Sequence, residues 1–439
     1  MATDASGSHR LGADPGDERG QTPPRHSGPQ GRGSTEPAVP DPEPAGQERP
    51  GAEAPGAGRP DSGGAQRLSA SALVESRAIL SGGIAALVAL VVGLVGFDGY
   101  RPSLAGERSV ADLAAVTTGV AAGGGFIAGY LQTIRGTHSW LSARPLLRQI
   151  VDGAALVVVH ASIAVMSSLV VFRMFQDAFF GLTVDAYAGG GMLAIAAGIA
   201  AYAAYDSGAR IDAAALSLLL AGFMASGMLV SMLAAENPLW WHIMFSELGT
   251  GQAGATSFWT FNTTMTTSGV ILTTLSSFVT RDLTRWAALR DADDAAAGRP
   301  RRRFLRPRAG VVRWGLIGVG LCMVGIGTVT LHVSEPVHTF FVRLLALILL
   351  ALLLGIPLWA PGYPRAFYAF TYIAGALLAG AASLWFPLHY YNLTALELAA
   401  AGIVFSWLVV FIRTTTAVTG TAAAPGRGGT RPVGGGARA

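Results

Sequence analysis

The sequence predicts an all-α fold: a polytopic bundle of about ten transmembrane helices with a disordered tail at each end. Only 13 % of the 439 residues are charged, against roughly 25 % in ordinary soluble domains. Apolar residues make up 51 %, and the first 66 residues contain no Phe, Trp, Tyr or Ile. The rest of the chain is therefore strongly apolar, and a membrane crossing needs about 20 such residues in a row.

Ten apolar segments have this length, and their unbroken apolarity favours helices over alternating strands. They are residues 78–97, 111–133, 150–172, 187–205, 213–235, 257–280, 312–331, 341–359, 366–386 and 394–412. Small residues recur within them, as in Gly119-x-x-x-Gly123 and Gly125-x-x-x-Gly129. Small residues let helix backbones approach closely in lipid, so these motifs predict tight packing and not a wide pore.

The chain divides into five regions by composition. Residues 1–70 are rich in Pro and Gly and bury too little apolar surface to order, so we expect a disordered tail. A six-helix region at 77–283, an Arg-rich loop at 284–310 and a four-helix region at 311–413 follow. The flexible tail at 414–439 ends the chain, and either tail could contact a separate cytoplasmic subunit.

The charges of the loops predict one orientation in the cell (cytoplasmic) membrane. Ten arginines lie between residues 281 and 313, and Arg135, Arg144 and Arg148 follow the second apolar segment. The opposite loops are mainly acidic. Since arginine-rich loops stay in the cytoplasm, we expect both termini there. This bias also accounts for the net charge of +4, so the lipid bilayer is the expected partner and nucleic acid is not.

Two absences exclude classes of chemistry. All 31 basic residues are arginine, and without lysine the chain cannot form the phosphate-binding loop of a P-loop ATPase. The single cysteine, Cys322, excludes an internal disulfide and every multi-cysteine zinc site. We expect no cofactor and no bound metal, and the sequence leaves open whether the protein is an enzyme.

Polar residues within the apolar segments form a candidate central cavity. His160 lies ten residues into its segment, about 15 Å deep at 1.5 Å per residue, and such a residue is a functional candidate by default. It could also be a packing group bonded to a neighbouring helix. The segment 257–280 carries many hydroxyl groups that could line a path for a polar solute. The candidate residues are His160, Ser167, Asp152, Asn262, Thr264 and Thr267.

A second group of polar residues lies in the loops predicted to face outward. Its members are Glu236, His242, Glu247, His332, Glu335 and His338. Imidazole and carboxylate groups suit a zinc site or a proton relay, but Pro336 interrupts the only close His and Glu spacing. An interfacial belt around Trp240 and Trp241 is the alternative. We also expect the turn at 246–250 to pack on the start of segment 257–280.

The stretch at 236–250, Glu-Asn-Pro-Leu-Trp-Trp-His-Ile-Met-Phe-Ser-Glu-Leu-Gly-Thr, is followed by Phe261, Asn262 and Gly269. This combination resembles the bacterial multipass membrane proteins of the domain-of-unknown-function family numbered 998. The stretches at 96–106 and 172–177 look like those of larger relatives, and the resemblance covers roughly residues 77 to 283. Some relatives are labelled ABC transporter permeases. The resemblance implies a helical membrane fold and no particular activity.

Three functions remain open at this point. The first is permease or carrier-like transport of a small polar solute or ion, which requires His160 and the threonines of segment 257–280 to meet at one cavity. The second is an intramembrane enzyme acting on lipid or envelope precursors, which requires His242, His332 and His338 to lie close together. The third is a structural or regulatory membrane subunit.

Overall fold

The computed structural model describes residues 62–135, 145–298 and 306–423. These residues form eleven α-helices and three short 3-10 helices, and they contain no β-strand. Nine of the described helices are long and apolar enough to cross a membrane. The predicted fold class is confirmed, and the chain is an integral, multipass membrane protein.

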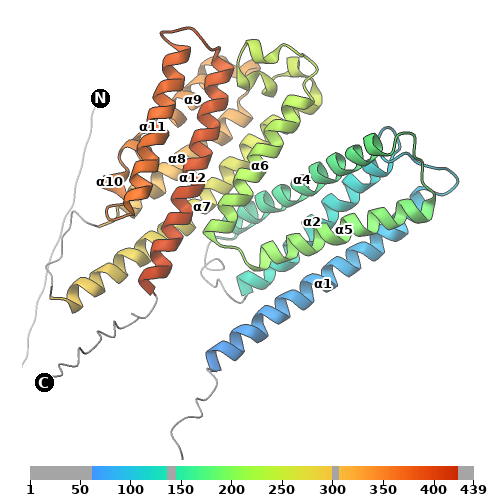
Figure 1. Cartoon of the computed structure of the whole chain (residues 1–439), viewed down its shortest axis with the longest axis horizontal. Helices are drawn as coiled ribbons and strands as arrows, with labels where there is room; N and C mark the ends of the chain where they lie inside the picture. The colour runs from blue at the N-terminus through green and yellow to red at the C-terminus, as the bar shows by residue number, and fades with distance from the viewer. Residues whose placement is uncertain (1–61, 136–144, 299–305, 424–439) are drawn as a thin grey trace, which may run out of the picture. The chain divides into compact units, whose positions relative to one another are not determined.

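Four helices pack together in the first half of the described chain (Figure 1). They are α1 (Ser62–Gly96), α2 (Val110–Arg135), α4 (Leu146–Ala178) and α5 (Ala186–Ala209). The second group comprises α6 (Ala213–Leu233), α7 (Ala255–Ala296), α8 (Ala309–Thr328), α9 (Leu331–Leu354), α10 (Ile356–Trp359), α11 (Arg365–Trp385) and α12 (Leu393–Ala423). Between α6 and α7 lie η1 (Trp240–His242), η2 (Phe245–Gly249) and η3 (Gly251–Ala253).

Glycine contacts hold the first group together. A Cβ atom added to Gly93 of α1 would lie 2.5 Å from the Cα of Gly190 on α5. A Cβ atom added to Gly125 of α2 would lie 2.4 Å from the carbonyl oxygen of Ala201 on α5. Both distances are too short for any side chain, so the backbones touch there. The predicted tight packing is confirmed for α1, α2 and α5.

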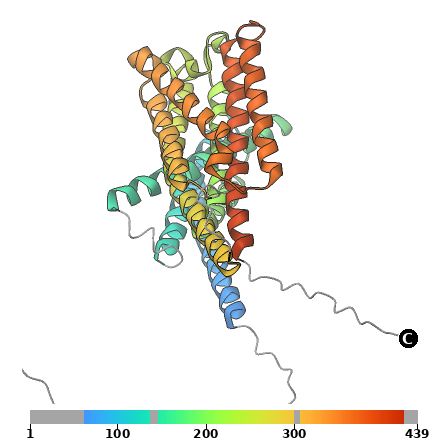
Figure 2. The same ribbon diagram turned by 90° about the vertical axis from the view of Figure 1, so that its left-hand side faces the viewer.

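The second group is arranged around α7, which contacts α6, α8 and α12. The carboxyl-terminal part of α12 passes α7 ahead of the end of α7 (Figures 1 and 2), and the Thr419 hydroxyl donates a hydrogen bond of 3.3 Å to the Asp282 carbonyl. Across both groups, large apolar side chains remain exposed on the helix surfaces, for example Val95 and Leu147, each 74 % accessible. Such extensive apolar surface is suited to lipid and not to water.

All ten predicted segments correspond to long helices, but several boundaries differ. Helix α1 begins at Ser62, inside the region 1–70 expected to be disordered. Helix α7 continues to Ala296 into the predicted loop 284–310, and α12 continues to Ala423 into the predicted tail 414–439. Beyond residue 280, α7 buries Leu283 and Trp286, and this packing accounts for its continued helical structure. The remaining parts of these regions, 1–61, 299–305 and 424–439, lie outside the described residues.

Candidate functional site

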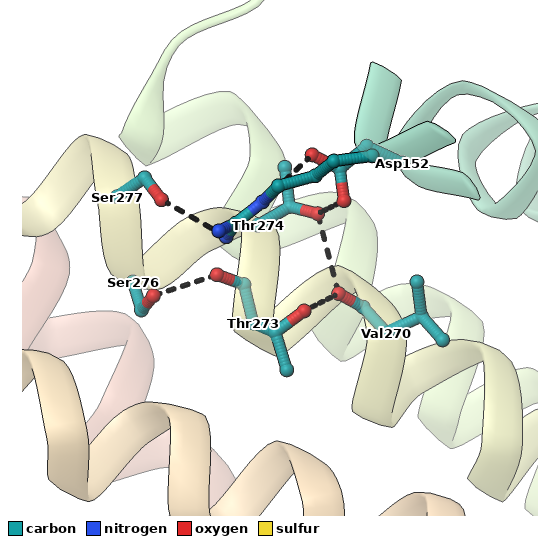
Figure 3. A network of polar contacts seen from close by, with 7 residues as sticks. Asp152, Val270, Thr273, Thr274, Ser276 and Ser277 are labelled. Atoms are coloured by element: carbon teal, nitrogen blue, oxygen red, sulfur yellow. Dashed lines mark hydrogen bonds and ion pairs between the residues drawn. The ribbon is translucent and has the colours of Figure 1, made fainter. Parts of the chain in front are cut away.

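A buried carboxylate lies where α4 meets α7. Asp152 of α4 is only 3 % accessible, and its Oδ1 accepts a hydrogen bond of 2.7 Å from the Thr274 hydroxyl of α7. Figure 3 shows the two side chains directed at each other across the helix contact. A carboxylate is expensive to bury in a membrane, so one held between two helices is a candidate functional group.

An arginine accompanies this carboxylate. Arg148 lies one turn before Asp152 on α4, and its Nε is 3.7 Å from Asp152 Oδ2. Its Nη2 donates a hydrogen bond of 3.4 Å to the Ser277 hydroxyl of α7. The guanidinium group therefore bridges the same two helices. Residues four apart face the same side of a helix, which is why α4 presents both charges to α7.

His160 lies elsewhere, among α4, α2 and α5. Its Nδ1 is 2.8 Å from the Leu156 carbonyl, and its Nε2 is 2.9 Å from the Ser207 hydroxyl of α5. The ring stacks on Phe126 of α2 at a centroid distance of 4.3 Å. Both nitrogens have partners and the ring is packed on one face. These contacts match the packing alternative for His160.

Ser167 does not join His160, because it is exposed while the adjacent Ser168 is buried. Seven residues return a helix to nearly the same face, which was the basis for expecting Ser167 beside His160. The buried face of α4 instead continues through Ser168, whose hydroxyl accepts a hydrogen bond of 3.3 Å from the Thr118 hydroxyl of α2. Ser167 therefore lies off the buried face of α4 that carries His160.

The polar residues of α7 are divided among several neighbours. Thr264 packs on Gly227 of α6, Thr267 is also buried, and Thr274 faces α4. Asn262 donates hydrogen bonds of 3.0 Å to the Gly249 carbonyl and 2.9 Å to the Phe258 carbonyl. These side chains serve packing on different sides, and they do not converge with His160 on one cavity.

The turn before α7 is packed as expected. The Ser257 hydroxyl donates a hydrogen bond of 3.0 Å to the Leu248 carbonyl, beside the bond from Asn262 to Gly249. Leu248 is fully buried, and Thr250 is nearly so. The prediction that 246–250 packs on the start of α7 is confirmed.

The six polar residues expected to face outward differ in burial and in their partners. Among the described residues, no group of three or more His, Cys, Asp or Glu side chains could hold a metal ion. Two of the six are buried with partners of their own: Glu247 accepts a hydrogen bond from Thr250, and His338 Nδ1 is 2.7 Å from the Val329 carbonyl. The other four are exposed: Glu236, His242, His332 and Glu335.

Two partners, one supplied by α12 and one by α4, were not predicted from the sequence. Glu397 of α12 accepts a hydrogen bond of 2.5 Å from the Phe245 backbone, and so ties α12 to η2. Arg148 had been assigned to a loop, although its four-residue spacing from Asp152 is a recognisable helix pair. No sequence pattern identified Ser277 as the partner of Arg148, because that contact depends on how α7 is rotated about its axis against α4.

A scan against protein-family models, a search of curated proteins and a search of solved structures each find no match for this chain. The resemblance to family 998 therefore stays a prediction.

Proposed function

We propose that this membrane protein is a carrier for a small polar solute or an ion, and that Asp152 is the ionisable group on which movement depends. The observation that carries the proposal is the Asp152–Thr274 hydrogen bond, because it puts a buried charge at a joint between two sets of helices. An ionisable residue inside a membrane bundle is a functional candidate by default, because such residues mark solute and proton paths.

The pattern of helix contacts supports the same proposal. Among the described helices, α1, α2, α4 and α5 mainly contact one another, and α6 to α12 do likewise. The substantial contacts between the two groups are made by α4 with α6 and α7. Carriers commonly work by rocking one rigid group of helices against another around a fixed site. A contact limited to one helix is suited to such a movement.

Protonation of Asp152 would weaken this joint. In its charged form, the carboxylate attracts Arg148 and accepts the Thr274 hydrogen bond. A neutral carboxyl loses the attraction to Arg148, which then keeps only its hydrogen bond to Ser277 across the contact. Binding a proton, or a cation in its place, is thereby linked to the separation of α4 from α7.

The competing functions have less support. A catalytic site requires His242, His332 and His338 within reach of one point, but His338 is buried against the Val329 carbonyl while the other two are exposed. A purely structural subunit would need Asp152 only to join α4 to α7, which an uncharged hydrogen-bonding side chain could do without the cost of a buried charge.

The proposed location is the cytoplasmic membrane, with both termini in the cytoplasm. It rests on the loop charges, chiefly the ten arginines between residues 281 and 313. In this orientation Asp152, which lies early in α4, is near the cytoplasmic end of the bundle. A separate cytoplasmic subunit remains a proposed partner of the tails.

Flux into proteoliposomes tests the proposed function. Vesicles holding purified protein and a pH-sensitive dye are exposed to gradients of H⁺, Na⁺ and K⁺, and then to a panel of amino acids and sugars. We expect wild-type flux of at least one of these and little in Asp152→Asn, which keeps the hydrogen-bond acceptor but removes the charge. Asp177→Asn is the matched control, because Asp177 is an exposed carboxylate on the same helix. Equal flux in wild type and Asp152→Asn, or no flux in any gradient, contradicts the proposal.

A further inference from the structure

An open, apolar groove runs along the surface between α8 and α9. Its walls include Gly310 and Trp314 of α8, Leu347 and Ala351 of α9, and Trp359 of α10. Its volume is about 630 Å³, within the roughly 300–1,000 Å³ of ordinary ligand pockets. Both α8 and α9 are apolar enough to cross a membrane, so the groove faces hydrocarbon along most of its length. We call it the α8–α9 groove.

The two tryptophans mark one end of this groove. Trp314 is 69 % accessible, and the Trp359 indole is fixed by a hydrogen bond of 3.1 Å to the Ala351 carbonyl. Tryptophan prefers the boundary between hydrocarbon and headgroups. The end of the groove at Gly310, where α8 begins, therefore lies at headgroup level.

Two arginines stand over these tryptophans. The Arg308 guanidinium carbon is 5.6 Å from the centre of the Trp359 ring, and the Arg313 guanidinium carbon is 5.8 Å from that of Trp314. Neither arginine has an acidic side chain within ion-pair distance in the described part of the chain, whereas the neighbouring Arg306 pairs with Asp291. The groove thus has an apolar wall and two cations without an acidic partner at its headgroup end.

We propose that the α8–α9 groove binds one anionic phospholipid, with an acyl chain along the apolar wall and the phosphate between Arg308 and Arg313. Guanidinium groups bind phosphate strongly through paired N–H donors. The amino-terminal end of α8 adds partial positive charge at the same place. An anionic lipid matches both the apolar wall and the cationic end. A protein partner would need both an apolar segment for the wall and an acidic group for the two arginines.

Native mass spectrometry of the full chain tests this inference. Protein purified in detergent is mixed with equal amounts of a phosphatidylglycerol and a phosphatidylcholine that carry identical acyl chains. An arginine near an anionic headgroup contributes on the order of fivefold in affinity, so two arginines predict a preference of about 25-fold for phosphatidylglycerol. Arg308→Gln/Arg313→Gln should reduce that preference to nearly one. Arg308→Lys/Arg313→Lys should keep most of it.

The matched control removes the same charge elsewhere. Arg101→Gln/Arg173→Gln changes two exposed arginines of the first four-helix group and should leave the preference unchanged. Gly310→Leu should weaken binding of both lipids, because a Cβ at Gly310 meets nothing within 4 Å and the larger side chain fills the groove. Gly83→Leu, at an equally open glycine of α1, should not.

Three outcomes overturn the inference. The first is an unchanged preference in Arg308→Gln/Arg313→Gln while its thermal unfolding matches wild type. The second is equal lipid binding by Gly310→Leu and Gly83→Leu. The third is a dimer of the chain in the wild-type mass spectrum that disappears in Gly310→Leu, because the groove would then be a surface for self-association.

Discussion

Replacing Gly125 of α2 by alanine should destabilise the protein, although alanine favours helices. The added Cβ would lie 2.4 Å from the Ala201 carbonyl oxygen and 3.0 Å from the Ala201 Cα. Ordinary contact begins at 3.4 Å, so α2 and α5 must separate by about 1 Å. The opposing atoms are backbone, and no change of side-chain rotamer can relieve the contact. Overpacking of this kind costs about 1–3 kcal/mol.

The adjacent Gly124 supplies the matched control. It is exposed, and a Cβ added there meets nothing within 4 Å. Both substitutions gain the same helix propensity, about 0.8–1.0 kcal/mol. The difference between Gly125→Ala and Gly124→Ala therefore isolates the contact with α5, and we expect it to be about 1–3 kcal/mol. Gly124→Ala itself should match wild type or exceed it in stability.

The single cysteine makes the measurement direct. Cys322 of α8 is buried and has no competing thiol in the chain, so a fluorogenic maleimide reacts once unfolding has spread from the first helix group to α8. Heating each variant in detergent with this dye gives an unfolding midpoint, and denaturant titration gives the free energy. If Gly125→Ala proves as stable as Gly124→Ala, the close approach of α2 to α5 is refuted.

Two further predictions concern His160 and the orientation. His160→Ala should lower the free energy of unfolding by about 1–3 kcal/mol, because it leaves the half-buried Ser207 hydroxyl without its His160 partner and removes the stack on Phe126, yet flux in proteoliposomes should persist. If His160→Ala is as stable as wild type but has lost its flux, His160 takes part in transport and is not a packing group. A reporter active only in the cytoplasm should give signal when fused at Gly298 and none at Glu335, and the reverse pattern would invert the orientation.

Hydrophobic runs predicted the number and order of the long helices but not where they end. Residues 281–296 contain too many charges to read as membrane helix, so they were assigned to a loop. They are helical because Leu283 and Trp286 face inward, and because Thr416 and Thr419 of α12 donate hydrogen bonds to Asp282. Such an extension depends on a partner more than 130 residues away in the sequence, as the separation of 137 between Thr419 and Asp282 illustrates. Local composition does not contain this information.

The sequence was sufficient to identify Asp152 as a candidate, but it was not sufficient to identify the residue that bonds to it. Asp152 was identified because a carboxylate in an apolar segment is costly to bury and is therefore a functional candidate. Its partner Thr274 lies 122 residues away, and many hydroxyl groups of α7 were equally eligible. Which one meets Asp152 depends on the rotation of each helix about its axis. A difference of one residue turns a helix by about 100°, and the position of Ser167 off the buried face has the same origin.

The polarity of α7 bears on how the bundle assembles. It is the one long helix in the described chain that is not apolar enough to count as a membrane span, and it is surrounded by α4, α6, α8 and α12. Its polar groups bond partly to the α7 backbone, as Thr280 does to the Ser276 carbonyl, and partly to other elements, as in the bonds of Asn262 to Gly249 of η2 and Thr274 to Asp152 of α4. Lipid could satisfy none of them. Helix α7 is therefore stable in the membrane only within the bundle, and the charge at Asp152 belongs to a contact that exists only after α4 and α7 have met.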